Sequence, residues 1–334
     1  MVFIAVHIGA GNHSKTKHDE YKKICSKACE EAMMALNDNS NSLDAVTVAI
    51  KCLENDYITN AGFGSNLNIA GNVECDACIM DGRDLIFGSV GAIHSIKNPI
   101  DVARHLVLKQ REPMPLGLIA PNFLVGDGAT KWANLNGFQQ SNLKSDESLK
   151  KHLKYKQCLD ECIDKTKSTN ASIKRARVDT VGAISVDNQG VVSSGVSSGG
   201  LILKQEGRVG QASIFGAGCW AEKNVSISTS GIGEYIVRTS LAKQFASDLL
   251  NEKSPLMTNI PHEDRLAGVL GLIHHKKTQR VELIWAHSTA SMCIGYMSNI
   301  DKSATSIISE MPPAVTPGAS VSVESTMLKY INHI

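Results

Sequence analysis

Apolar residues recur along this chain with two different periods, which predict a mixture of helices and strands. A spacing of three or four residues predicts helices near the N-terminus. Short apolar or alternating runs predict strands, beginning with a buried first strand at 1–6. The helices are expected at about 17–37, 42–53, 98–107, within 123–134, 150–162 and 234–250, and the strands at 65–70, 73–80, 87–93, 180–186, 191–196, 226–229, 269–274, 281–287 and 291–297. Strands between helical segments, with few strict strand–helix–strand alternations, predict an α/β protein of packed sheets covered by helices.

Two glycine-containing segments interrupt this pattern. The run His7-Ile8-Gly9-Ala10-Gly11 predicts a turn at which backbone approaches another group closely, because glycine has no Cβ. It lacks the GxGxxG spacing, so a dinucleotide site is not expected there. A second loop is expected at 53–64, rich in backbone carbonyls.

The middle of the chain has a different composition. Residues 144–177 contain ten Lys or Arg against five Asp or Glu, a local charge of +5 in a chain whose total is +1. Such runs are typical of solvated linkers, so residues 138–179 are expected to be a mobile basic linker within one structural domain. The cluster Lys174-Arg175-Ala176-Arg177 is also compatible with a nuclear import signal.

Composition excludes some classes of function. A net charge of +1 over 334 residues argues against direct nucleic-acid binding. The chain has no apolar run of about 18 residues and its first apolar run is too short for a signal peptide, so no membrane association is expected. Nine cysteines without an export signal predict a reducing, intracellular location, nuclear or cytoplasmic. Cys75 and Cys78 form a CxxC pair that nothing nearby completes into a zinc set.

The junction between the basic segment and the strand at 180–186 carries candidate chemistry. Thr180 follows Asp179 at the start of this apolar strand. A threonine hydroxyl is a weak nucleophile unless a base stands beside it, and one known base is the threonine's own α-amine. That amine exists only after the Asp179–Thr180 bond is cut. An ordinary loop-to-strand junction is the alternative interpretation of this stretch alone.

Seven ordered motifs together resemble the N-terminal-nucleophile asparaginase family. They are His7–Gly11, Asn60–Gly64, Asp76–Gly82, Asp179–Ala183, Ser198–Gly200, Arg208–Gly210 and Ser230–Glu234. The resemblance implies an N-terminal-nucleophile hydrolase fold, an αββα sandwich. It also implies self-cleavage at Asp179–Thr180 into residues 1–179 and 180–334, and assembly of two such heterodimers into a heterotetramer. Within the family, residues 14–21, 216–222 and 285–297 are similar to the threonine aspartases, or taspases.

The resemblance also implies roles for individual residues. Thr180 is expected to act as nucleophile and, through its new amine, as base, with Ser198 as the hydroxyl beside it. Ser230 and the Gly231 N–H match the family's donors to the oxyanion, and Asn60 matches an amide that assists self-cleavage. Arg208 is expected to clamp a substrate carboxylate, with Lys17 as a second cation and Tyr21 nearby.

One departure from the family pattern bears on the substrate. In members that cleave amino acids, an aspartate three residues after the arginine binds the substrate's free α-ammonium, whereas this chain has Gln211. A neutral amide has little reason to select a free amine, while the carboxylate clamp of Arg208 remains. The expected activity is therefore an endopeptidase that cuts proteins, such as nuclear regulators, after aspartate at an apolar-Asp site like Val178-Asp179.

The resemblance further implies a loop that can bind a monovalent cation, without any cofactor being required. Its residues are Leu53, Glu54, Asp56, Thr59, Ala61 and Phe63.

Two other functional classes stay open at this point. An isoaspartyl peptidase or L-asparaginase is disfavoured by Gln211. A non-catalytic scaffold is disfavoured because Thr180, Ser198, Arg208 and Ser230 occur together.

Overall fold

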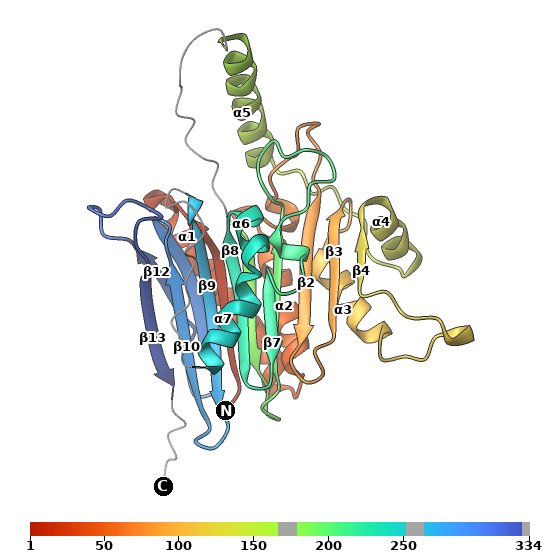
Figure 1. The fold of residues 1–334 in the computed structure, drawn as a ribbon, viewed down its shortest axis with the longest axis vertical. Helices are drawn as coiled ribbons and strands as arrows, with labels where there is room; N and C mark the ends of the chain where they lie inside the picture. The colour runs from red at the N-terminus through yellow and green to blue at the C-terminus, as the bar shows by residue number, and fades with distance from the viewer. Residues whose placement is uncertain (166–178, 252–263, 329–334) are drawn as a thin grey trace.

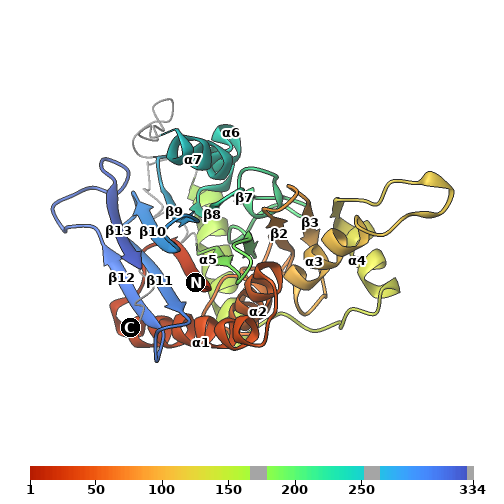
Figure 2. The same ribbon diagram turned by 90° about the horizontal axis from the view of Figure 1, so that it is seen from below.

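Two sheets packed face to face and covered by helices make up the protein, in a computed structural model that describes residues 1–165, 179–251 and 264–328. Seen from below, helices α6 and α7 lie on one side of the strands and α1 and α2 on the other (Figure 2). This arrangement confirms the expected αββα sandwich of an N-terminal-nucleophile hydrolase.

The larger sheet has eight strands in the order β12-β11-β1-β5-β6-β2-β3-β4. Its pairs are antiparallel except β3 with β4. The strands are β1 (Phe3–Gly11), β2 (Cys75–Asp81), β3 (Phe87–Ile93), β4 (Phe123–Val125), β5 (Val181–Val186), β6 (Val192–Ser198), β11 (Ser291–Ser298) and β12 (Thr305–Glu310). The central strands are buried on both faces, which explains why β1 and β5 are continuous small or apolar runs rather than alternating ones.

The smaller sheet has five strands in the order β13-β10-β9-β8-β7. These are β7 (Cys219–Glu222), β8 (Val225–Gly231), β9 (Ala267–His275), β10 (Arg280–His287) and β13 (Ser322–Leu328). The hairpin of β9 and β10 confirms the prediction for 269–287.

Helices cover the outer faces of both sheets, apart from α5, which extends away from them (Figure 1). They are α1 (His18–Asn37), α2 (Ser42–Glu54), α3 (Pro99–Lys109), α4 (Gly126–Leu135), α5 (Asp146–Lys165), α6 (Gly233–Thr239) and α7 (Leu241–Leu250), with short 3-10 turns η1 (Lys15–Lys17), η2 (Gly62–Gly64), η3 (Pro115–Gly117) and η4 (Gln211–Ser213). The helices α1 to α3 pack on the larger sheet around one apolar core, and a second core lies between the two sheets and α7.

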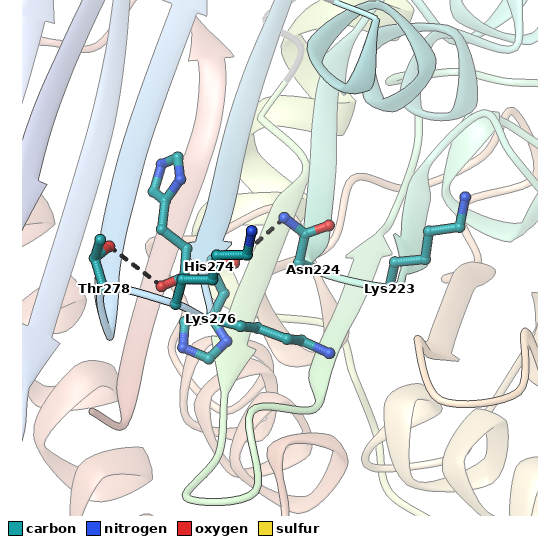
Figure 3. Close-up of a pocket in the computed structure, with 7 residues that line it drawn as sticks. Lys223, Asn224, His274, Lys276 and Thr278 are labelled. Carbon is teal, nitrogen blue, oxygen red and sulfur yellow. Dashed lines mark hydrogen bonds between the residues drawn. The ribbon is translucent and has the colours of Figure 1, made fainter.

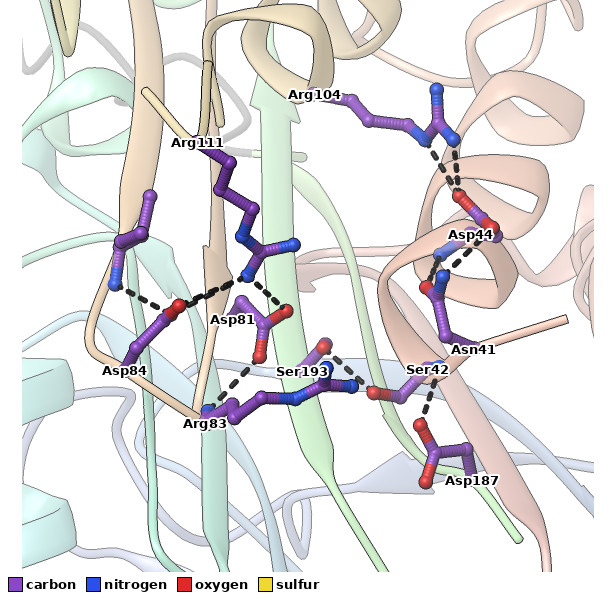
Figure 4. A network of polar contacts seen from close by, with 11 residues as sticks. Asn41, Ser42, Asp44, Asp81, Arg83, Asp84, Arg104, Arg111, Asp187 and Ser193 are labelled. Atoms are coloured by element: carbon purple, nitrogen blue, oxygen red, sulfur yellow. Dashed lines mark hydrogen bonds and ion pairs between the residues drawn. The ribbon is translucent and has the colours of Figure 1, made fainter. Parts of the chain in front are cut away.

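Polar contacts attach helix α2 to the strands that carry the Asp179–Thr180 junction (Figure 4). The Ser42 N–H donates to Asp187 Oδ2 at 3.1 Å, and the Ser42 hydroxyl lies 2.8 Å from that of Ser193. Asp187 is in the turn between β5 and β6, and Ser193 is on β6. The cap of α2 itself is Asn41, whose side chain accepts from the Asp44 N–H at 2.9 Å. Helix α2 is thereby tied to the β5–β6 hairpin through its first turn.

Several predicted elements differ in the structure. Residues 65–70 form no strand, because Asn68 closes a turn with Asn72, leaving one isolated bridge between Leu67 and Val73. The predicted turn at 7–11 lies within β1, where a register shift between His7 and Ala10 absorbs the glycines. The single helix predicted at 234–250 is two helices, since Ser240 adopts a left-handed conformation with φ of 45°. The strands β4, β7, β12 and β13 were not predicted.

Part of the predicted basic linker is helical, as expected for 150–162. Residues 146–165 form α5, longer than the helix expected at 150–162, which extends away from the sheets (Figure 1). Residues 166–178, including the cluster Lys174–Arg177, lie outside the described residues.

The packing of α2 on β6 leads to a test of stability. Ile50 is fully buried, and its Cδ1 reaches to 2.9 Å from where a Cβ on Gly195 of β6 would lie. Ile50→Ala should lower the free energy of unfolding by about 2–5 kcal/mol, because a cavity would remain under the hairpin. Met34→Ala, on the exposed face of α1, should change it by less than about 0.5 kcal/mol. Urea unfolding measures both, and equal effects would contradict this packing.

Candidate functional site

The Asp179–Thr180 backbone lies against Gly9 of β1. A Cβ on Gly9 would be 2.5 Å from Asp179 Cα and 3.1 Å from Thr180 N, and Gly9 has φ of 81°. Only glycine tolerates both the close approach and this conformation without strain. Thr180 directly precedes β5, which pairs with β1 on one side and β6 on the other. The close approach expected of the glycine-rich run is therefore made to the bond predicted to be cut.

The Thr180 hydroxyl belongs to a buried cluster of three predicted residues. It donates to Ser198 Oγ at 3.0 Å and accepts from Gln211 Nε2 at 3.1 Å. The Ser198 oxygen also accepts from the Gly200 N–H at 3.0 Å. All three side chains are buried, so water contributes little to orienting the Thr180 hydroxyl. The cluster joins the start of β5, the end of β6 and η4.

Asn60 supports the turn that follows Ser198. Its Nδ2 donates to Gly200 O at 2.9 Å, and its backbone carbonyl accepts from the Gly199 N–H at 2.8 Å. The Asn60 side chain oxygen accepts from the Asn66 N–H, which fixes the amide's orientation. Asn60 thus holds the Ser198–Gly200 turn in place beside Thr180.

Ser230 and Gly231 end β8 beside the irregular part of β1. The Ser230 oxygen accepts from the Ala10 N–H at 2.9 Å, so its own proton is available to donate to another acceptor. Gly231 has φ of 145°, and a Cβ there would lie 2.4 Å from Leu266 O. The predicted oxyanion donors are therefore positioned by β1 and by the start of β9, while their role stays a prediction.

The Arg208 side chain is paired with Glu234, a residue that was assigned no role from the sequence. Its Nε and Nη2 donate to Glu234 Oε1 at 3.0 and 2.7 Å. The Arg208 side chain is 16% exposed and that of Glu234 is 50% exposed. Glu234 closes the motif Ser230–Glu234, which is the signal that could have identified it.

The loop carrying Arg208 and Gln211 is held by a buried acid. Asp76, fully buried in β2, accepts from the Gly210 N–H at 2.8 Å and from the Ala92 N–H at 2.9 Å. Burial raises the pKa of Asp76, and nearby Lys204 opposes that shift. Lys204 is also buried, with its Nζ donating to Glu74 O at 2.8 Å. Neither residue was singled out for a role in sequence analysis, although Asp76 opens the motif at 76–82.

Lys17 and Tyr21 each contact an aromatic ring. Lys17 Nζ lies 5.7 Å from the centre of the Tyr57 ring, and the Tyr21 ring packs edge-on against His13 at 4.9 Å. These contacts do not join them to Arg208, and a role in substrate binding stays a prediction.

A buried histidine beside Thr180, His7, was assigned no role from the sequence. His7 Nδ1 accepts from the Gly9 N–H at 3.2 Å, so the ring hydrogen is on Nε2, which lies 2.9 Å from Ser228 Oγ. Burial lowers the pKa of His7 to about 3, partly offset by a hydrogen bond with the backbone of Thr180. His7 is therefore a neutral spacer between the two sheets. It opens the motif at 7–11, in which sequence analysis gave weight to the glycines alone.

Several carbonyls of the predicted cation loop face one point. Thr59 Oγ1 donates to Leu53 O at 2.7 Å and Asp56 O at 3.1 Å, with Ala61 O at 3.5 Å. The Thr59 hydroxyl occupies the point on which these carbonyls converge. Carbonyl oxygens are suitable ligands for a hard cation, and binding of one by this loop stays a prediction. Phe63, 38% exposed in η2, offers at most its backbone.

The Glu54 carboxylate of the same loop points elsewhere. It accepts from Ser197 Oγ at 2.7 Å, Asn98 Nδ2 at 3.0 Å and the Ile100 N–H at 3.1 Å. Burial raises the pKa of Glu54 to about 8, although these donors partly offset the shift. Glu54 links the loop to β6, one residue before Ser198.

A cavity of about 530 Å³ lies elsewhere, lined by residues of the turns between β7 and β8 and between β9 and β10 (Figure 3). Lys223 and His274 line it, at the ends of β8 and β9 remote from Ser230. The six residue steps of β8 correspond to roughly 20 Å, so this cavity is separate from the Thr180 cluster.

The described residues hold no group of three or more His, Cys, Asp or Glu side chains arranged to bind a metal ion. Among the helices of the described residues, none combines the length and apolar character needed to cross a bilayer.

Comparison with known proteins agrees with this geometry. A family model described as asparaginase matches residues 1–307. The chain is 39% identical over 250 residues to a plant-type L-asparaginase of Pyrococcus horikoshii, covering 73% of this chain and 78% of that protein. It is 37% identical over 238 residues to an isoaspartyl peptidase/L-asparaginase of Mus musculus, covering 70% and 68%. A Xenopus laevis protein of the latter name is 34% identical over 256 residues, covering 75% and 77%.

The buried Glu54 leads to a prediction about pH. Because its folded-state pKa of about 8 lies above the ordinary 4.5, the folded protein holds this proton more tightly than the unfolded chain. Its contribution to stability is therefore full below pH 4.5 and is lost as pH rises through about 8. Glu54→Gln should give a flatter profile of unfolding free energy across this range, measured by urea unfolding at each pH.

The control for this prediction is Glu206→Gln, which removes an exposed carboxylate. It should leave the profile unchanged. If the Glu54→Gln profile runs parallel to that of the unmodified protein, Glu54 does not titrate in this range.

Proposed function

Because the chain belongs to the asparaginase family of N-terminal-nucleophile hydrolases, we propose that it is a self-processing threonine endopeptidase that cleaves proteins after aspartate, as the taspases do. The observation that carries this proposal is the hydrogen bond from Gln211 Nε2 to Thr180 Oγ1. A neutral amide stands beside the nucleophile, in the position where amino-acid-cleaving members have an aspartate for a free α-ammonium. This pocket thus lacks that charge partner, while Arg208 still offers a clamp for a carboxylate.

Maturation comes first in the proposed mechanism. The Thr180 hydroxyl attacks the carbonyl carbon of Asp179 in the confined space beside Gly9, and the resulting ester is hydrolysed. This leaves a free α-amine on Thr180 and a carboxylate on Asp179. The amine is then the base that the hydroxyl needs, because it titrates near neutrality at roughly 7.7–8.0.

Cleavage of a substrate uses the same nucleophile. Arg208 binds the side-chain carboxylate of the substrate aspartate, which presents its main-chain carbonyl to Thr180. The α-amine accepts the hydroxyl proton as Thr180 attacks, and Ser230 with the Gly231 N–H donates to the oxyanion. The proton passes to the leaving amine, and water then hydrolyses the acyl ester. Ser198 accepts from the Thr180 hydroxyl in the resting state and keeps it oriented.

Two further features belong to this proposal. The carbonyls around Thr59 would bind a monovalent cation, which would make the loop preceding Asn60 more rigid.

Two processed protomers would pair into a heterotetramer, as the resemblance implies. The substrates would be nuclear or cytoplasmic regulators that contain an apolar residue followed by aspartate at the cleavage site.

An isoaspartyl peptidase or L-asparaginase is the second candidate. It is supported by the activities that the relatives are named for, at 34–39% identity to this chain. In both candidate functions Thr180 is the nucleophile and Arg208 binds a carboxylate of an aspartate-like substrate. They differ in whether a free α-ammonium is required, and Gln211 favours the first.

Thr180→Ala tests the maturation step. The unmodified chain should split into fragments of roughly 19 and 17 kDa, by proportion of its 35.9 kDa, with Thr180 as a new N-terminus. The variant should remain one chain, since it lacks the attacking hydroxyl. A denaturing gel with N-terminal sequencing of purified protein decides this. Splitting of the variant at the same bond would show that the cut is not intramolecular.

Matched peptides test the specificity. A peptide containing the Val178-Asp179 cleavage site should be cleaved at least ~30-fold faster than its Asn twin, because the neutral amide cannot form the charged clamp with Arg208. Arg208→Ala should slow the Asp peptide and narrow this difference. Gln211→Asp should weaken endopeptidase cleavage by placing a negative charge near the bound carboxylate. Steady-state rates of the matured variants provide the measurement.

The same preparations distinguish the two candidate functions. Ammonia release from L-asparagine, or hydrolysis of a β-aspartyl dipeptide, by the unmodified protein would favour the second candidate. Equal rates on the Asp and Asn peptides would remove the argument for an aspartate-specific endopeptidase.

A further inference from the structure

We propose that Glu234 is a resident carboxylate that occupies Arg208 in the free protein and competes with the substrate carboxylate for it. Glu234 is thereby a specificity residue that sets the affinity of the site for acidic substrates. This inference rests on the proposed function of Arg208 as a carboxylate clamp, and no role for Glu234 followed from the sequence motifs.

The contact uses two donors of Arg208, which converge on one oxygen of Glu234. Nε and Nη2, two donors on one edge of the guanidinium, both reach Glu234 Oε1 at 3.0 and 2.7 Å. That edge is one of the two that present a pair of parallel N–H groups to a carboxylate. A substrate carboxylate that uses this edge must therefore displace Glu234.

The Arg208 side chain is more buried than that of Glu234, as replacement of Glu234 by a substrate carboxylate requires. The Arg208 side chain is 16% exposed, and glycines surround its head: Nη1 lies 3.1 Å from where a Cβ on Gly200 would be, and Nη2 lies 2.9 Å from that on Gly233. The Glu234 side chain is 50% exposed. Arg208 is thus held by the interior, while the Glu234 carboxylate can be solvated when it leaves.

The other nearby acid cannot take this role. Asp76 is fully buried, and its two oxygens accept from the Ala92 and Gly210 N–H groups. It stabilises the backbone that carries Arg208 rather than acting as an exchangeable partner.

The position of Glu234 connects exchange with catalysis. It is in the first turn of α6, three residues after Gly231, and the intervening Gly233 lies against Gln211, with Oε1 2.7 Å from where a Cβ would be. Displacement of Glu234 therefore occurs beside the predicted oxyanion donors and beside the amide that contacts Thr180. An acidic substrate that binds Arg208 through this edge replaces the internal carboxylate next to these groups.

Glu234→Gln tests the competition directly. The amide keeps the shape of the side chain but loses its charge, so Arg208 becomes available to other carboxylates. We expect calorimetry to show that succinate, a small dicarboxylate, binds this variant about three- to tenfold more tightly than the unmodified protein. The KM for the Asp peptide should fall, and the rate ratio of Asp to Asn peptide should rise. Glu234→Ala should also bind succinate more tightly than the unmodified protein does, which would show that the effect does not come from the introduced glutamine.

Two controls complete the experiment. Glu206→Gln removes a negative charge from the same loop as Arg208 without a contact to it in the described residues, and it should leave succinate affinity unchanged. Arg208→Ala should abolish the gain when combined with Glu234→Gln. Thermal unfolding confirms that each variant is folded.

The outcomes separate this inference from the proposed function. If both Glu234 variants bind succinate no more tightly than the unmodified protein does, Glu234 does not compete with the substrate. Weaker binding by both variants would mean that Glu234 only orients Arg208. If succinate binding survives in Arg208→Ala, the clamp is elsewhere and the inference is overturned. Failure to cleave any peptide would refute the endopeptidase while the calorimetry still decides the role of Glu234.

Discussion

The site depends on the insertion of β5 between β1 and β6, which buries the main chain at Thr180. Hydrogen-bonded ladders on both sides set the position of Val181, and the absence of a Cβ on Gly9 lets the preceding bond lie against β1. A residue at the end of such a strand, as Thr180 is, has little freedom to move. Its hydroxyl therefore needs only Ser198 and Gln211 to set its direction.

Two buried polar side chains near Thr180, Glu54 and His7, find hydrogen-bond partners on neighbouring strands. Glu54 joins the loop before Asn60 to Ser197, and His7 joins the Gly9 turn to Ser228 on the facing sheet. A buried donor or acceptor without a partner typically costs about 1–3 kcal/mol, so these contacts favour a single arrangement of the strand ends. The same contacts connect helix α2 and the facing sheet to the strands that position Thr180.

Charge around the substrate position is arranged asymmetrically. Arg208 is held from the interior by a backbone that Asp76 stabilises, and from the rim by Glu234. On the other side, the neutral Gln211 contacts the nucleophile. The site therefore combines an arginine paired with a carboxylate and a neutral amide at position 211. Under the proposed function, that combination selects an aspartate within a peptide over a free amino acid, on a fold that the family shares.

Local patterns in the sequence were sufficient for α1, α2, β5, β6 and the β9–β10 hairpin, since periodicity reports which face of a segment is buried. The ordered motifs were likewise sufficient to gather Thr180, Ser198 and Gln211 into one hypothesis, and the structure brings them together. Only the tertiary structure decided that Glu54 turns toward β6, that Ser240 interrupts a continuous helical pattern, and that Arg208 is paired with Glu234. These features depend on the packing of segments distant along the chain or on which partner a side chain meets, and neither leaves a local period that a sequence can reveal.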